Sequence, residues 1–204
     1  MAAAVGARIP IQDPSGNMIV NLGGGLTEVA VISLDGIVNW KATRTAGLTL
    51  DSDIIKFARD EFNLVLGEMV AEDIKRKIGS ALELTEPIEM QMRGRDVMSG
   101  LPKEFDINDS QIREAMHKSV QHILDTIKST LETTPPELVA DIYQKGIILT
   151  GGVAMLKNID KFIAQGIEIP VHVADDPQTC TVRGMGVIIG DEILLADIVV
   201  PSSQ

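Results

Sequence analysis

Aromatic residues and cysteine are scarce in this sequence. Its 204 residues include four Phe, one Trp, one Tyr and a single cysteine, Cys180, and the aromatic share is 3%. So few rings exclude the stacking platforms on which single-stranded nucleic acid is bound. One thiol excludes an internal disulfide and any metal site built from several cysteines.

Basic residues are in deficit as well. Eighteen Lys and Arg stand against 29 Asp and Glu, which gives a net charge of −11. An acidic surface repels phosphate backbones, so nucleic acid is not an expected partner. No apolar run reaches the roughly 18 residues that span a bilayer, and residues 1–8 lack the pattern of a signal peptide. We therefore expect a cytoplasmic protein with no membrane segment in this chain.

The composition is otherwise that of an ordinary folded protein, with 45% hydrophobic and 23% charged residues. Short apolar runs predict three strands in an antiparallel meander, at 18–22, 27–34 and 37–45. Asp35-Gly36 is typical of the two-residue turn of a hairpin, because both central positions of a type I′ turn need positive φ. A run of three glycines forms the other turn of the meander.

The rest of the chain alternates between helix and strand patterns. Apolar spacing predicts a helix that is capped by Asp51 and ends near Phe62, and a long helix at 108–131 with Asn108 and Gln111 as a capping box. Further helices are expected at 71–81, 136–146, 156–164 and 179–195, and further strands at 83–85, 88–92, 105–107, 147–150 and 171–173, with a break at Gly94. The tail 201–204 is expected to be frayed. This order predicts an α/β lobe that is interrupted by a smaller α+β insertion.

Two predicted strands run directly into glycines. Gly23, Gly24 and Gly25 follow the first strand, and Gly151 and Gly152 follow the strand at 147–150. Glycines without a Cβ let backbone N–H groups approach a polyanion closely, and the N-terminus of a following helix favours an anion. One such turn by itself is typical of a tight connection. The pair, in an α/β pattern, leaves a nucleotide site and two tight turns as the open interpretations.

Several longer strings resemble the MreB family of bacterial actins. The segment 23–34 is similar to the second phosphate loop of that family, and 149–156 is similar to its adenosine loop. The strings at 67–75, 93–102, 131–138 and 170–174 follow in the same order. The resemblance covers about residues 1–190. It implies half of an actin-like (ribonuclease H-like) fold with a mixed five-stranded sheet, in which 1–50 and 135–204 form an inner lobe and 51–134 a small α+β outer lobe.

The resemblance also implies a site for ATP or ADP with Mg²⁺. Family members would place phosphate at Gly23, Gly24, Gly25 and Thr27, ribose and base near Glu72 and Lys75, and adenine against Gly151, Gly152, Val153, Ala154 and Met155. Taken without the resemblance, Glu72 and Lys75 are a solvated ion pair three residues apart on a helix.

Two positions depart from the family pattern. Asn21 stands where the family has an acidic residue that helps to hold Mg²⁺, and Leu26 stands where it has the first threonine after the glycines. An amide lacks the charge that a hard cation prefers. The family's first phosphate loop and its water-positioning glutamate correspond to sequence before Met1. We therefore expect weak nucleotide binding and little or no hydrolysis by this chain alone.

The expected function is that of a truncated MreB-like cytoskeletal protein of cell-shape determination, which acts by assembly or partner binding. Its expected partners are further copies of itself, full-length MreB-like subunits and other cell-shape proteins, through which it would reach the membrane. One alternative is an ATPase half that a separate chain completes, and another is a fragment of a longer gene product. A sugar kinase or DnaK-type chaperone is a further alternative, against which the strings at 93–96 and 134–136 argue.

Overall fold

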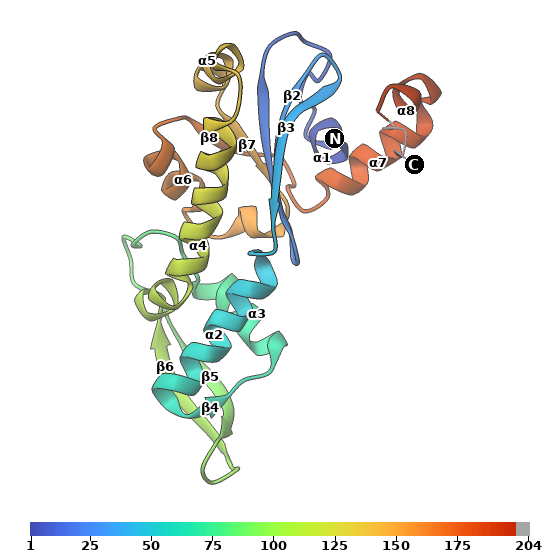
Figure 1. Ribbon diagram of the computed structural model, residues 1–204. Coiled ribbons are helices and arrows are strands. Elements are labelled where there is room, and N and C mark those ends of the chain that lie inside the picture. Colours follow the sequence, from blue (N-terminus) through green and yellow to red (C-terminus); the bar gives the residue numbers. More distant parts are fainter. Residues whose placement is uncertain (199–204) are drawn as a thin grey trace.

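The computed structural model of this protein describes residues 1–198, so the predicted frayed tail lies outside the described residues. Two lobes lie one beyond the other along a long axis (Figure 1). The inner lobe contains a five-stranded sheet with helices on both faces. The outer lobe contains a three-stranded sheet and two helices.

The inner sheet has the strand order β3-β2-β1-β7-β8. Its strands are β1 (Asn17–Leu22), β2 (Thr27–Ser33), β3 (Gly36–Thr43), β7 (Ile147–Thr150) and β8 (Val171–Val173). The first three are antiparallel, whereas β7 is parallel to β1 and β8 is parallel to β7. The predicted mixed five-stranded sheet is therefore confirmed, and the glycines that follow the parallel strands β1 and β7 lie at the same end of it.

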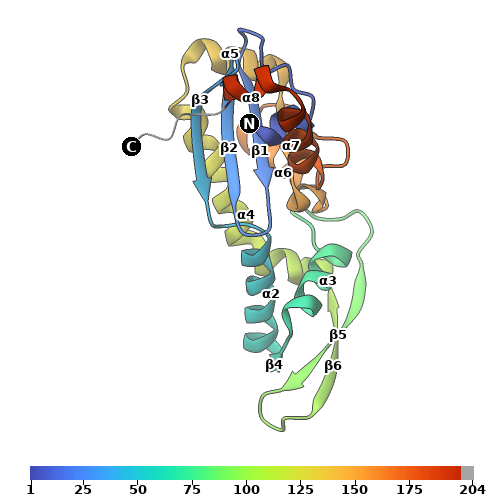
Figure 2. The same ribbon diagram turned by 90° about the vertical axis from the view of Figure 1, so that its right-hand side faces the viewer.

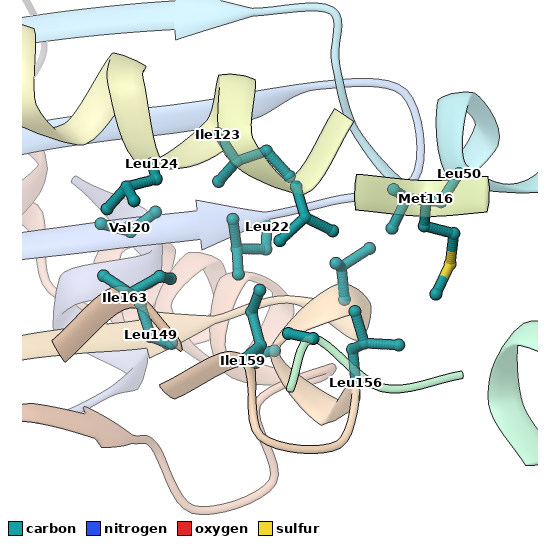
Figure 3. Close-up of a cluster of buried hydrophobic side chains, with 14 of the residues drawn as sticks. Val20, Leu22, Leu50, Met116, Ile123, Leu124, Leu149, Leu156, Ile159 and Ile163 are labelled. Carbon is teal, nitrogen blue, oxygen red and sulfur yellow. The ribbon is translucent and has the colours of Figure 1, made fainter. Parts of the chain in front are cut away.

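Alternate residues of the strands pack on opposite faces of this sheet. Val20 and Leu22 belong to the main core, where they lie among side chains of α4 (Asp109–Glu132) and α6 (Ile159–Ile167) (Figure 3). Ile142 of α5 (Pro136–Lys145) belongs to the same core. Ile19 and Ile32 belong to a second, smaller core on the side of α1 (Ala2–Gly6), α7 (Cys180–Gly190) and α8 (Glu192–Ile198). Figure 2 shows α4 and α7 on the two sides of the strands. This is the period-2 burial of a sheet that is covered on both faces.

Two glycines allow α1 and α7 to touch through their backbones. A Cβ added at Gly6 would lie 1.7 Å from the carbonyl oxygen of Cys180, and one at Gly184 would lie 1.8 Å from that of Ala2. The predicted closing helix is interrupted at Asp191, between α7 and α8.

The outer lobe is built from α2 (Gly47–Phe62), α3 (Glu68–Ile78) and the antiparallel strands β4 (Leu64–Val65), β5 (Glu89–Asp96) and β6 (Pro102–Asn108). Asp96 closes the β5–β6 turn, because its carboxylate accepts hydrogen bonds from Lys103 Nζ and from the backbone and hydroxyl of Ser99. These bonds, that of Lys103 above all, hold the pKa of Asp96 well below its usual range.

Helix α4 runs from the outer lobe to the inner sheet (Figure 1). The C-terminal half of α4 lies against the inner sheet, where Ser129 and Thr130 accept hydrogen bonds from Lys41 and Asn39 of β3. The main core is one continuous cluster across the two lobes. The boundary predicted between residues 50 and 51 falls inside α2, and the division of the chain into an inner and an outer lobe stays a prediction.

Some local predictions differ from the structure. The positive-φ residues of the β2–β3 turn are Leu34 and Asp35, at φ 50° and 59°, and Gly36 already pairs with Ser33 in the ladder. The turn is held there because the N–H groups of Leu34 and Asp35 donate to carbonyls of the preceding loop, at Asp13 and Ile11.

Other differences lie in the outer lobe and around it. Asp51 is no cap, because α2 starts one turn earlier, at Gly47. The segment 83–85 forms no strand, and the short strand β4 was not predicted. Gly94 lies within β5 rather than breaking it, since a Cβ there would come within 2.7 Å of Leu64 and Val65 of β4. Here glycine marks a close approach of two strands.

Candidate functional site

The two glycine turns are in direct contact. Strands β1 and β7 run parallel as neighbours, with Asn21 beside Thr150, so the residues that follow them leave the sheet together. Gly151 has φ +86°, and a Cβ there would lie 2.3 Å from the carbonyl oxygen of Leu22. Only glycine fits this conformation and this approach.

The first turn of α2 joins the two glycine turns. Gly47 N–H donates to the Gly23 carbonyl at 3.0 Å and Leu48 N–H to the Gly24 carbonyl at 2.8 Å. A Cβ at Gly47 would lie 3.2 Å from Val153 Cγ2 and 3.3 Å from Gly24 Cα. Two N–H groups at the start of α2 are thus used to fix the glycine loop, which is the reason that the helix begins there.

A cavity of about 320 Å³ opens beside these turns, between the inner lobe and α3. We call it the cleft. Its lining residues are Gly23, Gly24, Gly47, Leu48, Asp51, Glu72, Lys75, Arg76, Gly152, Val153, Met155, Leu156 and Gln178. A hydrogen bond also joins the segment after α3 to the segment before α6, in which Ala81 N–H donates to the Lys157 carbonyl at 2.8 Å.

Most of the residues predicted for a nucleotide site meet in this cleft. Gly23, Gly24, Glu72, Lys75, Gly152, Val153 and Met155 line it, whereas Gly25, Thr27, Gly151 and Ala154 stand outside the lining. Thr27 is fully buried, and its hydroxyl donates to the Thr45 carbonyl at 2.8 Å. Gly151 supports the site as the glycine on which the contact of the two turns depends.

The sequence did not point to Gly47, Leu48, Asp51, Arg76 or Gln178 as lining residues, whereas Leu156 lies in the string that resembles the adenosine loop of the family. Gly47 lies four residues before the predicted start of its helix at Asp51, so no predicted element marked it. Gln178 reaches the cleft from a loop after β8, and its Nε2 lies 3.7 Å from the position of a Cβ on Gly152. No local pattern marks that contact.

Lys75 has a different partner from the one predicted. Its Nζ lies 2.8 Å from Asp51 Oδ1 and donates to the Gly47 carbonyl at 3.1 Å, and both side chains are largely buried. Burial raises the pKa of Asp51, Lys75 opposes that shift, and Glu72 and Glu68 add to it. The structure has no ion pair between Glu72 and Lys75, so the solvated i,i+3 pair is not what these residues form.

The glycine loop keeps two free donors. Gly23 N–H donates to the Leu26 carbonyl at 3.0 Å, while the N–H groups of Gly24 and Gly25 have no acceptor within residues 1–198. A Cβ on either of these two glycines would meet open space. The loop can therefore offer two backbone donors to an incoming group.

The departures from the family pattern lie next to this loop. Asn21 Nδ2 donates to Glu28 Oε2 at 3.2 Å, and its Oδ1 accepts from the Thr150 hydroxyl at 3.3 Å. Leu26 exposes 40% of its surface. Mg²⁺ in nucleotide sites is usually bound through one or two carboxylates together with the phosphates of the substrate. At this position the protein offers the Glu28 carboxylate and the Asn21 amide oxygen. The donor set fits a nucleotide better than it fits a metal held by protein alone.

Among the described helices, none has the length and apolar character needed to cross a membrane.

Comparison with known proteins adds the context of this cleft. The sequence model of one family, described as MreB/Mbl protein, matches residues 1–195. The cell shape-determining protein Mbl of Bacillus subtilis (strain 168) is 42% identical over 187 residues, which are 92% of this chain and 56% of Mbl. The cell shape-determining protein MreB of Escherichia coli (strain K12) is 44% identical over 186 residues, 91% of this chain and 54% of that protein. The chain thus spans about half the length of these relatives.

Solved structures agree with the fold. MreB5 of Spiroplasma citri bound to ADP is 40% identical with a TM-score of 0.89, over 92% of this chain and 57% of MreB5. The structure of the same protein bound to AMPPNP has a TM-score of 0.90 at 38% identity, over 97% and 59%. A MamK double helical filament, at 20% identity and a TM-score of 0.77 over 93% of this chain and 57% of MamK, has the same fold.

Proposed function

This chain belongs to the MreB/Mbl family, and from that premise we propose that it is a cell-shape-determining, actin-like protein that acts by assembly or partner binding. The observation that carries the proposal is the junction of both glycine turns with α2 and α3 around one cleft, in a chain that matches its relatives across both lobes.

The cleft is the proposed site of an adenine nucleotide, ADP or ATP. The related MreB5 has been solved bound to ADP and to AMPPNP. We extend nucleotide binding to this chain because its two glycine turns meet around one cleft. Gly152, Val153 and Met155 would lie against the base, and the free N–H groups of Gly24 and Gly25 would face the phosphates. Mg²⁺, when bound, would supply positive charge to the phosphate oxygens.

We propose that this chain alone hydrolyses ATP slowly or not at all. Leu26 has no hydroxyl to hold a phosphate or a water, and Asn21 carries no negative charge to hold a metal. Its amide is already engaged by Glu28 and Thr150. Phosphoryl transfer needs charge neutralisation and an oriented water, and neither side chain supplies these.

The proposed partners are further copies of the chain, full-length MreB-like subunits and cell-shape proteins, met in the cytoplasm or at the membrane through those partners. The outer lobe projects from the inner one and ends in the β5–β6 turn, where Met98 and Leu101 expose 87% and 64% of their surface (Figure 1). Exposed apolar side chains on a rigid turn suit a protein contact.

Electron microscopy and sedimentation test this proposal. The 204-residue chain is expected to form filaments or sheets, or to join filaments of a full-length relative such as E. coli MreB. A Met98→Ser, Leu101→Ser variant should lose this ability while it keeps its melting temperature. Its matched control is Met69→Ser, at an equally exposed methionine of α3. If the chain sediments as a monomer alone and with the relative, assembly is refuted.

A second candidate function is an ATPase half that a separate chain completes. The observation that favours it is the outer surface of α7, where Val182, Met185, Val187 and Ile189 are all at least half exposed. In a solution of this chain with ATP and Mg²⁺, a small amount of a full-length relative should raise the rate of phosphate release. The rise should exceed the rate that the same amount of the relative gives alone. An unchanged rate per relative subunit would refute it.

A further inference from the structure

Strand β3 is the outermost strand on its side of the inner sheet (Figure 2). It pairs with β2 alone, so the backbone N–H and C=O groups of alternate residues face away from the sheet. Within residues 1–198, no loop or helix bonds to the backbone groups of 36–43. A row of free donors and acceptors of this kind is a template for another strand.

This edge has few of the features that keep edge strands from pairing. A shift in register leaves Val38 without a partner residue on β2, but 39–43 pair regularly. The strand contains no proline. Its one charged residue, Lys41, is directed to α4, where its Nζ donates to the Ser129 carbonyl at 2.6 Å. The segment 39–43 is therefore open to an added strand.

One face of β3 is apolar and exposed. Trp40 lies beside Ala30 of β2, on the face of the sheet that carries the smaller core, and exposes 65% of its surface. Val38 is exposed as well. Large apolar side chains beside an open edge offer contact surface to alternate side chains of an added strand.

The opposite face of β3 is bordered by basic side chains. Lys41 lies on that face, Arg44 follows the end of the strand, and His122 Nε2 of α4 lies 3.2 Å from Thr43 Oγ1. Lys118 precedes His122 by one turn of α4. In the described part of the chain, Lys41, Arg44 and Lys118 form no ion pair with a carboxylate. Their charges are thus available to a partner.

These cations stand out in a protein whose net charge is −11. The segment between Asp35 and Asp51 contains no acidic residue. On α4, Asp125 is acidic, and its Oδ1 accepts from Gln121 Nε2 at 2.9 Å. Two copies that paired through β3 would bring like charges together, whereas an acidic segment would neutralise them. Charge therefore favours an acidic partner over a second copy.

We propose that the open edge of β3 binds an extended segment of a partner protein in which acidic and apolar residues alternate. The segment extends the sheet by one strand. Its apolar side chains pack beside Trp40 and its carboxylates face Lys41 and Arg44, because successive side chains of a strand point to opposite faces. This inference goes beyond the proposed function, since it uses neither the cleft nor the β5–β6 turn, and its failure leaves both of those proposals standing.

Fluorescence of Trp40, the only tryptophan of the chain, tests the inference directly. The probe is a peptide of about eight residues, without aromatic side chains, in which Val and Glu alternate. Its binding is expected to shift the emission of Trp40 to shorter wavelength, because the indole leaves water. A peptide of the same composition, with all Val in one block and all Glu in another, should bind at least about tenfold more weakly. Equal binding of the two peptides, or binding of neither, overturns the inference.

The variant Arg44→Glu tests the charge. It should weaken binding of the alternating peptide by about tenfold or more and leave the melting temperature unchanged. Arg59→Glu is the matched control, at an exposed arginine of α2 that has no ion pair within residues 1–198. Its affinity should stay within about twofold of the original. Equal losses in the two variants would mean that the peptide follows net charge and not the edge of β3.

Methylated peptides test the backbone pairing on the unaltered chain. Methyl groups on the backbone nitrogens of alternate residues remove the donors on one edge of the peptide. Of the two possible peptides, one is expected to lose binding and the other to keep it. If both still bind, side chains alone hold the peptide and strand addition is refuted.

The emission of Trp40 also reports on a second copy. Without peptide, it is expected to stay constant as the protein concentration is raised, even where the chain assembles through other surfaces. A shift to shorter wavelength that grows with concentration would mean that another copy covers this edge, and it would overturn the proposed acidic partner.

Discussion

Replacing Gly151 by alanine tests whether the contact of the two glycine turns holds the cleft together. Gly151 has φ +86° and ψ 169°, a region that is open to glycine almost alone. The new Cβ would lie 2.3 Å from the Leu22 carbonyl oxygen and 2.6 Å from its carbon, and both are backbone atoms. These atoms belong to a central strand and cannot turn aside as a flexible side chain would.

Two costs add up in this variant. The unfavourable φ and ψ contribute about 1–3 kcal/mol. Relief of the overlap needs a shift of β7 away from β1, which contributes about 1–3 kcal/mol more, as overpacking of a core does. We expect the free energy of unfolding to fall by about 3 kcal/mol or more and the melting temperature to fall by about 6–12 °C.

Urea unfolding and calorimetry provide the measurement, with Gly152→Ala as the control. At Gly152 the nearest atom to an added Cβ is Gln178 Nε2, at 3.7 Å, and the backbone is not in the left-handed region. The control should therefore lose less than about 1 kcal/mol. Equal losses in the two variants would show that strain at Gly151 is not what the structure depends on.

Three further predictions concern the charges. Lys75→Met should destabilise the fold by about 3–5 kcal/mol, because it leaves the buried Asp51 carboxylate unpaired. Adding Asp51→Leu should restore most of that loss. A double-mutant cycle by urea unfolding measures both effects, and additive losses would contradict the pairing. Lys103 and Ser99 lower the pKa of Asp96 in the folded state below its ordinary value of 3.8, so the stability that Asp96 contributes is present above that pH and is lost as the pH falls below it. Asp96→Asn should flatten the decline of unfolding free energy below about pH 4, and an unaltered decline would refute this. Asn21→Asp should lower the melting temperature without Mg²⁺, because the new carboxylate would face that of Glu28, whose Oε2 now lies 3.2 Å from Asn21 Nδ2. Adding Mg²⁺ and ATP should restore the melting temperature. A variant whose melting temperature does not respond to Mg²⁺ would argue against a metal at this position.

Features that depend on a few neighbouring residues could be predicted from the sequence. The capping box of α4 is one example, because Asn108 and Gln111 bond each other's backbone across three residues. The start of α5 at Pro136 and its end at Gly146 are others. In each case both partners of the interaction lie within one turn of the chain, so the local pattern contains the whole physical cause.

Features that depend on distant partners were placed wrongly or missed. The helix α2 begins at Gly47 because Gly47 and Leu48 donate to carbonyls of a loop at 23–24. The β2–β3 turn includes Leu34 because its N–H finds the Asp13 carbonyl. Neither acceptor is near its donor in sequence, so apolar spacing and turn propensity had no access to them.

The sequence by itself determined the antiparallel meander of β1, β2 and β3, the glycines at the ends of β1 and β7 and the membership of the MreB/Mbl family, since each depends on contiguous residues. Only the tertiary structure decided that Lys75 pairs with Asp51 rather than with Glu72, that Thr27 is buried away from the cleft, and that Gln178 reaches into it. The reason is that charge pairing and burial depend on distances between packed elements, and for Lys75 and Asp51 it is the packing of α3 on α2 that sets this distance.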